Sequence, residues 1–309
     1  MTRQTQAWDA PSRGEPKHSQ ARRKSGAGDM MPGLYVTATP IGNARDMTLR
    51  ALDVLEGADL IAAEDTRVTA KLLAIYAIAK PVVAYNDHNA PHERPKLLRQ
   101  LRDGARIALV SDAGTPLVSD PGFKLVRQAL AEGIAVHAIP GASAPLAALA
   151  LAGLPTDRFF FAGFLPPKAG ERRGVLEELK SLRSTLIFFE APQRLAGSLA
   201  DMAAVFGARP AAVARELTKL HEEARRGTLA ELACAYAGED RPKGEITLVI
   251  GPPSETETDF SRVDAALDRA LAFMPLRAAV DLVSEMLSAP RRDVYARALA
   301  KKQDGEATP

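Results

Sequence analysis

Short apolar segments alternate with amphipathic stretches of about ten residues through the first half of the chain. This alternation constrains the fold more than any other feature, because strands that alternate with helices form βαβ units, in which neighbouring strands are parallel. The sequence therefore predicts an α/β domain with a parallel sheet over residues 33–153. Its strands are expected at 34–39, 60–63, 81–85, 107–111 and 134–139, and its helices at 46–56, 67–76, 91–102, 123–132 and after Gly141.

The alternation continues over residues 154–252, which predicts a second α/β domain. The segment 222–227 can form an additional short strand, so this second sheet is expected to be mixed. The other strands are expected at 159–164, 185–190, 211–216 and 245–250, and the helices at 170–182, 193–206 and 228–237.

The two ends of the chain depart from this pattern. Residues 1–32 are polar and lack apolar periodicity, so they predict a disordered tail. This tail is basic, since residues 1–30 carry six basic and three acidic side chains, whereas the whole chain has a net charge of only +2.

At the other end, residues 253–309 predict a linker, a small helical module and a tail. The module is interpreted either as a packing appendage or as a helix-turn-helix-like unit that contacts nucleic acid. Its helices are expected at 262–273, 275–287 and 290–300, and its candidates for phosphate contacts are Arg269, Arg277, Arg291, Arg292 and Arg297.

Several classes of protein are excluded by features that the sequence lacks. Cys234 is the only cysteine, which excludes a disulfide framework and multi-cysteine metal sites and fits a reducing, cytoplasmic setting. No dinucleotide-binding, P-loop or serine-hydrolase motif is present, and no metal site is expected. The uncharged stretch 133–156 is long enough to span a membrane, but Pro140 and Gly141 divide it into a strand and a core helix, so a soluble protein is expected.

Four loops that follow predicted strands are rich in Gly, Pro, Asp and Thr. They are ATPIGN at 38–43, AEDTR at 63–67, SDAGTPLVSDPG at 111–122 and PGASA at 140–144. Any one of them is compatible with ordinary turn chemistry. Together they would surround one crevice, because ligands of parallel sheets bind at the carboxyl ends of the strands. A ligand held by backbone carbonyl and amide groups therefore stays open.

Charged residues that could perform acid–base chemistry lie in or near these loops. A lone loop histidine such as His88 is more often solvated or a cap than a base, and Glu64 or Asp65 could simply form an ion pair with Arg67. The full set of candidates is Glu64, Asp65, Arg67, His88, Asp112, Asp120, Arg215, Glu216, Lys219, Glu222 and Glu223.

Long motifs along residues 33–252 carry a specific resemblance. The segments that carry it include TPIGN, AAEDTR, VSDAGTPLVSDPG, IPGASA, GLPTDRFFFAGFLPPK, EAPQR, ARELTK and KGE. With them the chain resembles the ribosomal RNA small subunit methyltransferase I family, which belongs to the tetrapyrrole methylase superfamily. Two positions depart from the family's pattern: Ala90 stands where Glu is usual, and EAPQR at 190–194 stands where ESPHR is usual.

The resemblance implies an activity, a cofactor and partners. It implies two α/β domains with the cofactor cleft between them, S-adenosyl-L-methionine as the methyl donor, and the 2′-hydroxyl of the cytidine at position 1402 of 16S rRNA as the acceptor. It also implies a homodimer. The positions that match the superfamily's cofactor contacts are Pro40, Asp112, Ala113, Gly114, Thr115, Val118, Ser143 and Ala144, with Glu190 and Leu217 in the second domain.

Methyl transfer to a hydroxyl requires the acceptor to be activated. Positioning supplies much of the rate of an in-line displacement, but the hydroxyl has a pKa far above neutral and needs a base or a stabilising cation. Glu64, Asp65, His88 and Lys219 are the candidates, and the sequence does not choose between them. Two other functions are kept open: a small-molecule tetrapyrrole methylase of the same fold, and a non-enzymatic RNA-binding or assembly protein.

Overall fold

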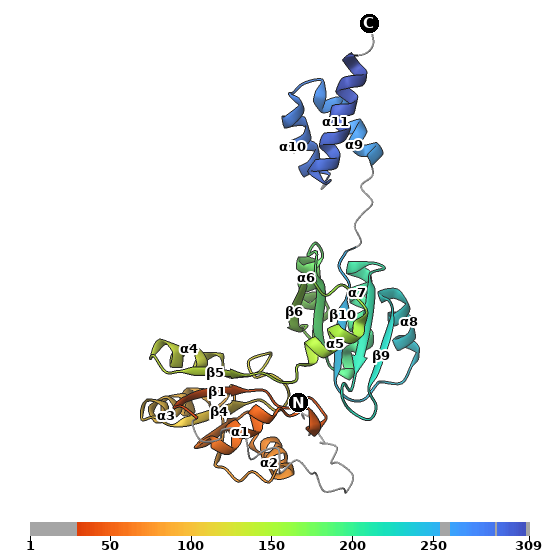
Figure 1. Ribbon diagram of the computed structural model, residues 1–309. Coiled ribbons are helices and arrows are strands. Elements are labelled where there is room, and N and C mark those ends of the chain that lie inside the picture. Colours follow the sequence, from red (N-terminus) through yellow and green to blue (C-terminus); the bar gives the residue numbers. More distant parts are fainter. Residues whose placement is uncertain (1–29, 254–259, 288, 307–309) are drawn as a thin grey trace. The chain divides into compact units, whose positions relative to one another are not determined.

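The computed structural model describes residues 30–253, 260–287 and 289–306 (Figure 1). The predicted disordered tail lies outside these residues, apart from its last three positions. The chain divides into two compact units, residues 1–252 and 253–309, which are described separately below. No described helix is both long and apolar enough to cross a membrane.

The first half of the larger unit contains the predicted parallel sheet. Its strand order is β3-β2-β4-β1-β5, and every neighbouring pair is parallel. The strands are β1 (Gly33–Thr37), β2 (Leu60–Ala63), β3 (Val82–Ala84), β4 (Arg106–Val110) and β5 (Val136–Ile139). The helices are α1 (Leu49–Gly57), α2 (Thr66–Ile75), α3 (Ala90–Arg102), α4 (Phe123–Ala131) and α5 (Ala144–Ala152).

Helices cover both faces of this sheet, and the strand sequences explain why. Successive side chains of a strand point to opposite faces. In β1, Tyr35 packs with α1 and α2, whereas its neighbour Leu34 packs with α3 and α4. Because both faces of the inner strands β1, β2 and β4 are covered, these strands are mostly apolar rather than alternating.

Helix α5 packs against the second sheet. Ala148, Leu149 and Ala152 share a buried cluster with Ile187 of β7 and Val249 of β10. The uncharged stretch that includes this helix therefore forms strand β5 and a core helix, as predicted.

The second sheet is mixed, as the sequence predicts. Its order is β6-β7-β10-β8-β9; β6 and β7 are parallel and the other pairs are antiparallel. The strands are β6 (Phe159–Phe164), β7 (Thr185–Glu190), β8 (Pro210–Arg215), β9 (Glu223–Thr228) and β10 (Ile246–Ile250). Helices α6 (Ala169–Leu179), α7 (Leu195–Phe206) and α8 (Leu229–Gly238) pack on the face opposite to α5.

The smaller unit consists of the three predicted helices, α9 (Phe260–Leu271), α10 (Leu276–Met286) and α11 (Arg291–Glu306). Each helix contributes an apolar stripe to one core, in which Val263, Leu267, Val280, Val283 and Val294 are almost fully buried. This unit therefore has a core of its own.

Candidate cofactor and catalytic site

The loops that follow β1 and β4 are joined by backbone hydrogen bonds. The amide of Thr39 donates to the carbonyl of Gly114 at 2.9 Å, and the amide of Gly114 donates back to the carbonyl of Thr39 at 3.0 Å. The Thr39 hydroxyl also donates to the carbonyl of Ser111 at 3.2 Å. These two loops meet because β1 and β4 are adjacent parallel strands, so their carboxyl ends lie side by side.

Two further loops join this pair. The Thr115 hydroxyl donates to the carbonyl of Ala142 in the loop after β5, at 3.1 Å. The Asp112 carboxylate accepts a hydrogen bond from the amide of Asp65, in the loop after β2, at 2.9 Å. The prediction that four loops gather at one edge of the sheet is therefore confirmed. Eight predicted cofactor contacts lie on these loops: Pro40, Asp112, Ala113, Gly114, Thr115, Val118, Ser143 and Ala144.

The loop after β4 has an unusual backbone. Within nine residues, Gly114, Leu117, Ser119 and Gly122 all have positive φ angles, at 78°, 75°, 66° and 131°. For a residue with a side chain this conformation costs about 1–2 kcal/mol, so the surrounding structure must hold Leu117 and Ser119 in place. Strained loop residues of this kind concentrate at ligand sites.

A loop from the second half of the unit packs against residues 38–43. It follows β8, and its Thr218 hydroxyl accepts a hydrogen bond from the amide of Asn43 at 3.1 Å. Leu217 and Ile41 belong to one buried cluster. A Cβ atom added at Gly42 would lie 2.5 Å from Cγ of Lys219, so only glycine allows this close approach. Leu217, a predicted cofactor contact, therefore lies beside the first-half loops.

Lys219 is held by two carboxylates. Its Nζ lies 2.7 Å from Oε1 of Glu216 and 2.9 Å from Oε2 of Glu245. Burial lowers the pKa of Lys219, but the two carboxylates outweigh burial and the pKa is raised overall. Lys219 is therefore an ammonium cation at neutral pH and cannot act as a base.

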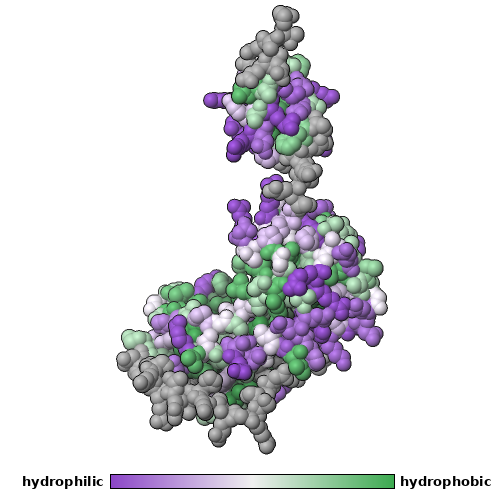
Figure 2. All heavy atoms as spheres, turned by 45° about the vertical axis from the view of Figure 1, so that its right-hand side comes forward, coloured by the Kyte–Doolittle hydropathy of each residue, from purple (hydrophilic) through white to green (hydrophobic). Residues whose placement is uncertain are grey.

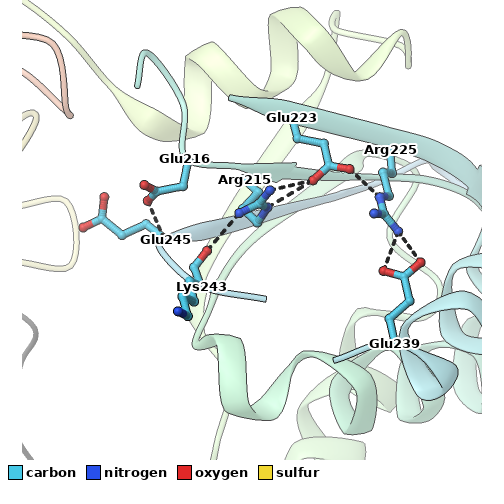
Figure 3. A network of polar contacts seen from close by, with 7 residues as sticks. All are labelled: Arg215, Glu216, Glu223, Arg225, Glu239, Lys243 and Glu245. Atoms are coloured by element: carbon cyan, nitrogen blue, oxygen red, sulfur yellow. Dashed lines mark hydrogen bonds and ion pairs between the residues drawn. The ribbon is translucent and has the colours of Figure 1, made fainter. Parts of the chain in front are cut away.

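The backbone around Glu216 is shaped to hold this carboxylate. Its Oε1 also accepts a hydrogen bond from the amide of Glu245 at 3.0 Å (Figure 3). Gly244 has a φ of +94°, and a Cβ atom there would overlap the Glu216 carboxylate. Burial raises the pKa of Glu216, but the hydrogen bonds from Lys219 and Glu245 outweigh it and lower the pKa overall. The KGE segment thus supports Lys219 through Glu216.

The neighbouring charged residues form a structural network (Figure 3). Glu223 pairs with Arg225 at 2.5 Å and with Arg215 at 2.9 Å, and Arg225 pairs in turn with Glu239 at 2.6 Å. The hydrogen bonds from Arg225 and Arg215 lower the pKa of Glu223. These pairs tie β8, β9 and the end of α8 together, so Arg215 and Glu223 have a structural role here.

Asp65 is the N-cap of α2. Its carboxylate accepts hydrogen bonds from the amide of Arg67 at 2.8 Å and from the Arg67 guanidinium at 2.6 Å. Hydrogen bonding by the Arg67 side chain lowers the pKa of Asp65 to about 2. The ion pair that the sequence analysis kept as an alternative is therefore present. With so low a pKa, Asp65 is a weak base.

Glu64 and His88 lie near this cap in different environments. Glu64 is buried at the end of β2, and its backbone carbonyl accepts a hydrogen bond from the Asn86 side chain at 3.4 Å. His88 lies in the loop that contains Asn86 and is exposed; its amide donates to Oδ1 of Asn86 at 3.2 Å. The structure thus brings both residues to the edge that carries the four loops.

Glu190 is buried, and its carboxylate has three partners from nearby residues. It pairs with Arg194 at 2.6 Å, accepts a hydrogen bond from the amide of Ala191 at 2.8 Å, and also accepts one from the Ser198 hydroxyl. These partners of the Glu190 carboxylate all lie within the next eight residues of the chain. A cofactor contact by Glu190 stays a prediction. Gly42, Gly244 and Glu245 were not among the residues predicted for the site, although they lie in the motifs TPIGN and KGE.

Comparison with known proteins identifies two segments. The profile of the Tetrapyrrole (Corrin/Porphyrin) Methylases matches residues 33–233, and that of the RsmI C-terminal HTH domain matches residues 257–302. A protein from Mesorhizobium japonicum named ribosomal RNA small subunit methyltransferase I is 51% identical over 88% of this chain and 92% of its own length. A protein of the same name from Pseudomonas aeruginosa is 46% identical over 87% of this chain and 97% of its own length.

Solved structures show the same fold. The uroporphyrin-III C-methyltransferase of Thermus thermophilus, in complex with S-adenosylhomocysteine, superposes with a TM-score of 0.50 over 71% of this chain and 97% of its own. At 22% sequence identity, this likeness concerns the fold alone.

Proposed function

Because the chain belongs to the ribosomal RNA small subunit methyltransferase I family of the tetrapyrrole methylases, we propose that it methylates the 2′-hydroxyl of the cytidine at position 1402 of 16S rRNA. It is an S-adenosylmethionine-dependent rRNA methyltransferase. The observation that supports the proposal best is the set of four hydrogen-bonded loops at one sheet edge, against which the Leu217–Lys219 loop packs.

The loops suit S-adenosylmethionine because that molecule carries a sulfonium cation, an adenine and an amino-acid end but no phosphate. We propose that it is held by backbone groups and small side chains of the loops at 38–43, 111–118 and 142–144, with Gly114 allowing close approach of the backbone. When bound, it supplies an activated methyl group. Contacts from Leu217 and Glu190 stay part of this proposal.

For the acceptor, we propose that Glu64 and Lys219 share the work. Lys219 is cationic and would stabilise negative charge on the acceptor oxygen or bind a nearby phosphate. Glu64 would orient the hydroxyl or take its proton. Asp65 would act as a positioning residue, since its carboxylate caps α2 directly after Glu64. His88 is kept as a candidate base at the edge of the site.

The two other functions have less support. A small-molecule tetrapyrrole methylase rests on likeness to solved structures at 22% identity, which extends to the fold only. A non-enzymatic binding protein would not need the strained loop after β4 or the glycine at 114.

We also propose a homodimer that works in the cytoplasm on the small ribosomal subunit. The support for a dimer is the edge strand β6, on which Phe159, Phe160 and Phe164 are 46%, 43% and 57% exposed. An edge strand that presents large apolar side chains is typically covered by a partner. Light scattering of the purified protein should give twice the 33.0 kDa chain mass.

The function is tested with labelled S-adenosylmethionine and two acceptors, 30S subunits and a tetrapyrrole. Label should appear in 16S rRNA, and ribose analysis should place it on the 2′-oxygen of one cytidine. Glu64→Gln and Lys219→Ala should each lose two or more orders of magnitude in turnover with cofactor affinity retained, which is the scale of acid–base catalysis. Label in the tetrapyrrole, or on a base instead of a ribose, would overturn the proposal.

A further inference from the structure

The smaller unit contains a hollow at the point where two of its helices begin. The hollow has a volume of about 390 Å³ and is lined by Arg277, Arg291, Arg292 and Tyr295. Arg277 is the second residue of α10, and the other three lie in the first turns of α11. Three arginines and one tyrosine therefore line one open, shallow hollow.

The arginines of this unit differ in whether a carboxylate already neutralises them. Arg297 pairs with Asp264 at 2.6 Å and stacks on Phe260, and Arg291 pairs with Asp281 at 2.7 Å. Within the described part of the chain, no carboxylate pairs with Arg277 or Arg292, and both are exposed. These two arginines are thus available to an anionic ligand, while the pair with Asp281 fixes Arg291 as a wall of the hollow.

Tyr295 adds a surface for stacking. It is 37% exposed, although its neighbour Val294 is fully buried in the core of the unit. A tyrosine anchored in this way offers a flat ring at little entropic cost, and such rings stack on unpaired bases. The positive ends of α10 and α11 also lie at the hollow and favour negative charge there.

We propose that this hollow is a nucleotide-binding site for single-stranded RNA, in which Arg277 and Arg292 bind phosphate and Tyr295 stacks on a base. Arginine next to an aromatic ring is the combination by which proteins hold single strands. Hydrophilic side chains also occupy much of the face of this unit seen in Figure 2. The inference rests on the proposed function only in its choice of RNA, because that function makes 16S rRNA the substrate.

The test measures binding of a fluorescent single-stranded RNA of about ten nucleotides to the full-length protein over a range of salt concentrations. Replacing both Arg277 and Arg292 with alanine should lower affinity at least tenfold. The slope of log affinity against log salt should become shallower by about 1.4, or 0.7 for each lost phosphate contact. A merely structural role would not change this slope.

Tyr295→Ala should lower affinity by about fivefold to a hundredfold, and Tyr295→Phe should restore it to within about twofold, because the ring is kept. Arg262→Ala and Phe273→Ala are matched controls. Both residues are exposed in the same unit, and neither lines the hollow. They should change affinity less than about twofold. If the hollow variants behave like these controls, the proposal is wrong.

Two further measurements separate this inference from the proposed function. Each variant is assayed for S-adenosylmethionine binding by calorimetry and for methyl transfer to 30S subunits. Loss of RNA binding with cofactor affinity intact supports the site. RNA binding that depends on the hollow without any transfer to 30S subunits would contradict the proposed function alone. Preferential binding of an acidic peptide over RNA would overturn the site as an RNA site.

Discussion

Gly114 shows most directly how one residue shapes the site. Its backbone pairs with Thr39 in both directions, and its φ of +78° lies where side chains are disfavoured. A Cβ atom there would also lie 3.2 Å from Cγ2 of Ile41, in the loop that follows β1. Any larger residue must therefore strain the loop, move Ile41, or both.

We predict that Gly114→Val weakens S-adenosylmethionine binding at least tenfold and costs about 1–2 kcal/mol of stability. Gly133→Val is the matched control. Gly133 has a similar φ of +71°, no atom lies within 4 Å of its added Cβ, and it follows α4. It should lose similar stability but retain cofactor affinity. Calorimetry measures affinity and urea unfolding measures stability; equal affinities of the two variants would remove Gly114 from the cofactor site.

Asp65 also leads to a prediction at the scale of one residue. Because its pKa is lowered in the folded protein, its ionisation makes the stability of the fold depend on pH. The folded pKa of about 2 lies below the ordinary 3.8. Between these pH values the unfolded state therefore binds more protons than the folded state. The stabilisation of the fold by the ionised Asp65 carboxylate is thus complete above pH 3.8 and is lost as the pH falls towards 2. Since Arg67 is exposed, the contribution should be at most about 1 kcal/mol.

We predict that Asp65→Asn, which keeps a capping side chain, lowers stability at pH 7 and that its deficit shrinks as the pH falls from 4 towards 2. Asp59→Asn is the comparison. Hydrogen bonding by Arg106 likewise lowers the pKa of Asp59 to about 2. Asp59 precedes β2, whereas Asp65 follows it, so Asp59 lies at the end of the strand opposite to the site. Urea unfolding should show the same pH trend for both. A hundredfold loss of turnover in Asp65→Asn alone would instead identify Asp65 as the base.

At the scale of elements, the loop at 38–43 packs against the loop at 216–222. This contact places Leu217 and Lys219 beside the loops that follow the strands of the first sheet. Their residues are about 175 positions apart in sequence. The side chain of Lys219 crosses Gly42, and Glu216 and Glu245 fix its end. Leu217 lies in the same loop and shares a buried cluster with Ile41 of the loop at 38–43.

We predict that Gly42→Ala forces the two loops apart and weakens cofactor binding about tenfold, because the added Cβ would meet Cγ of Lys219 at 2.5 Å and the carbonyl of Leu217 at 3.1 Å. Gly174→Ala, inside α6 with no atom within 4 Å of the added Cβ, is the control and should be neutral or slightly stabilising. Unchanged affinity in Gly42→Ala, measured by calorimetry, would contradict this reading of the contact.

The elements were largely predictable from the sequence, because local patterns determine them. Apolar segments located the other strands of both sheets, and the charged segment 222–227, which was expected as a possible additional strand, forms β9 in the mixed second sheet. Helix α1 begins at Leu49 instead of residue 46, since Thr48 caps it and residues 44–46 form a 3-10 turn. Boundaries of this kind depend on capping geometry, which the apolar pattern does not report.

The site was predictable only in part. The edge on which the loops gather follows from the parallel sheet, so the four loops could be placed together. The contact of Gly42 with Lys219 could not be predicted, because it joins residues far apart in sequence and local patterns contain no pairing information. Nor could the pattern show that α5 packs on the second sheet, since its sequence is apolar on all sides.

At the scale of the whole molecule, the chain is built from units whose cores are separate. The buried clusters of the larger unit contain described residues no later than Ile250, whereas the core of the smaller unit runs from Val263 to Ala298. A polypeptide that ends after Pro252 therefore keeps both sheets and every helix that covers them. All residues proposed for the cofactor and for catalysis lie in this larger unit.

We predict that truncation after Pro252 leaves S-adenosylmethionine affinity within about twofold of the full chain but raises the KM for 30S subunits at least tenfold, with a smaller change in kcat. The larger unit retains the five loops of the site, so the chemistry should persist, while the phosphate contacts proposed for the arginines of α10 and α11 are lost. Raising the salt concentration should narrow the difference in KM for 30S subunits between the full chain and the truncated protein, because screening weakens the phosphate contacts that only the full chain makes. Steady-state kinetics with 30S subunits at two salt concentrations measures both effects. Equal KM values of the two proteins at low salt would show that the smaller unit does not hold the substrate. Loss of cofactor binding in the truncated protein would show that the larger unit needs the smaller unit in order to fold.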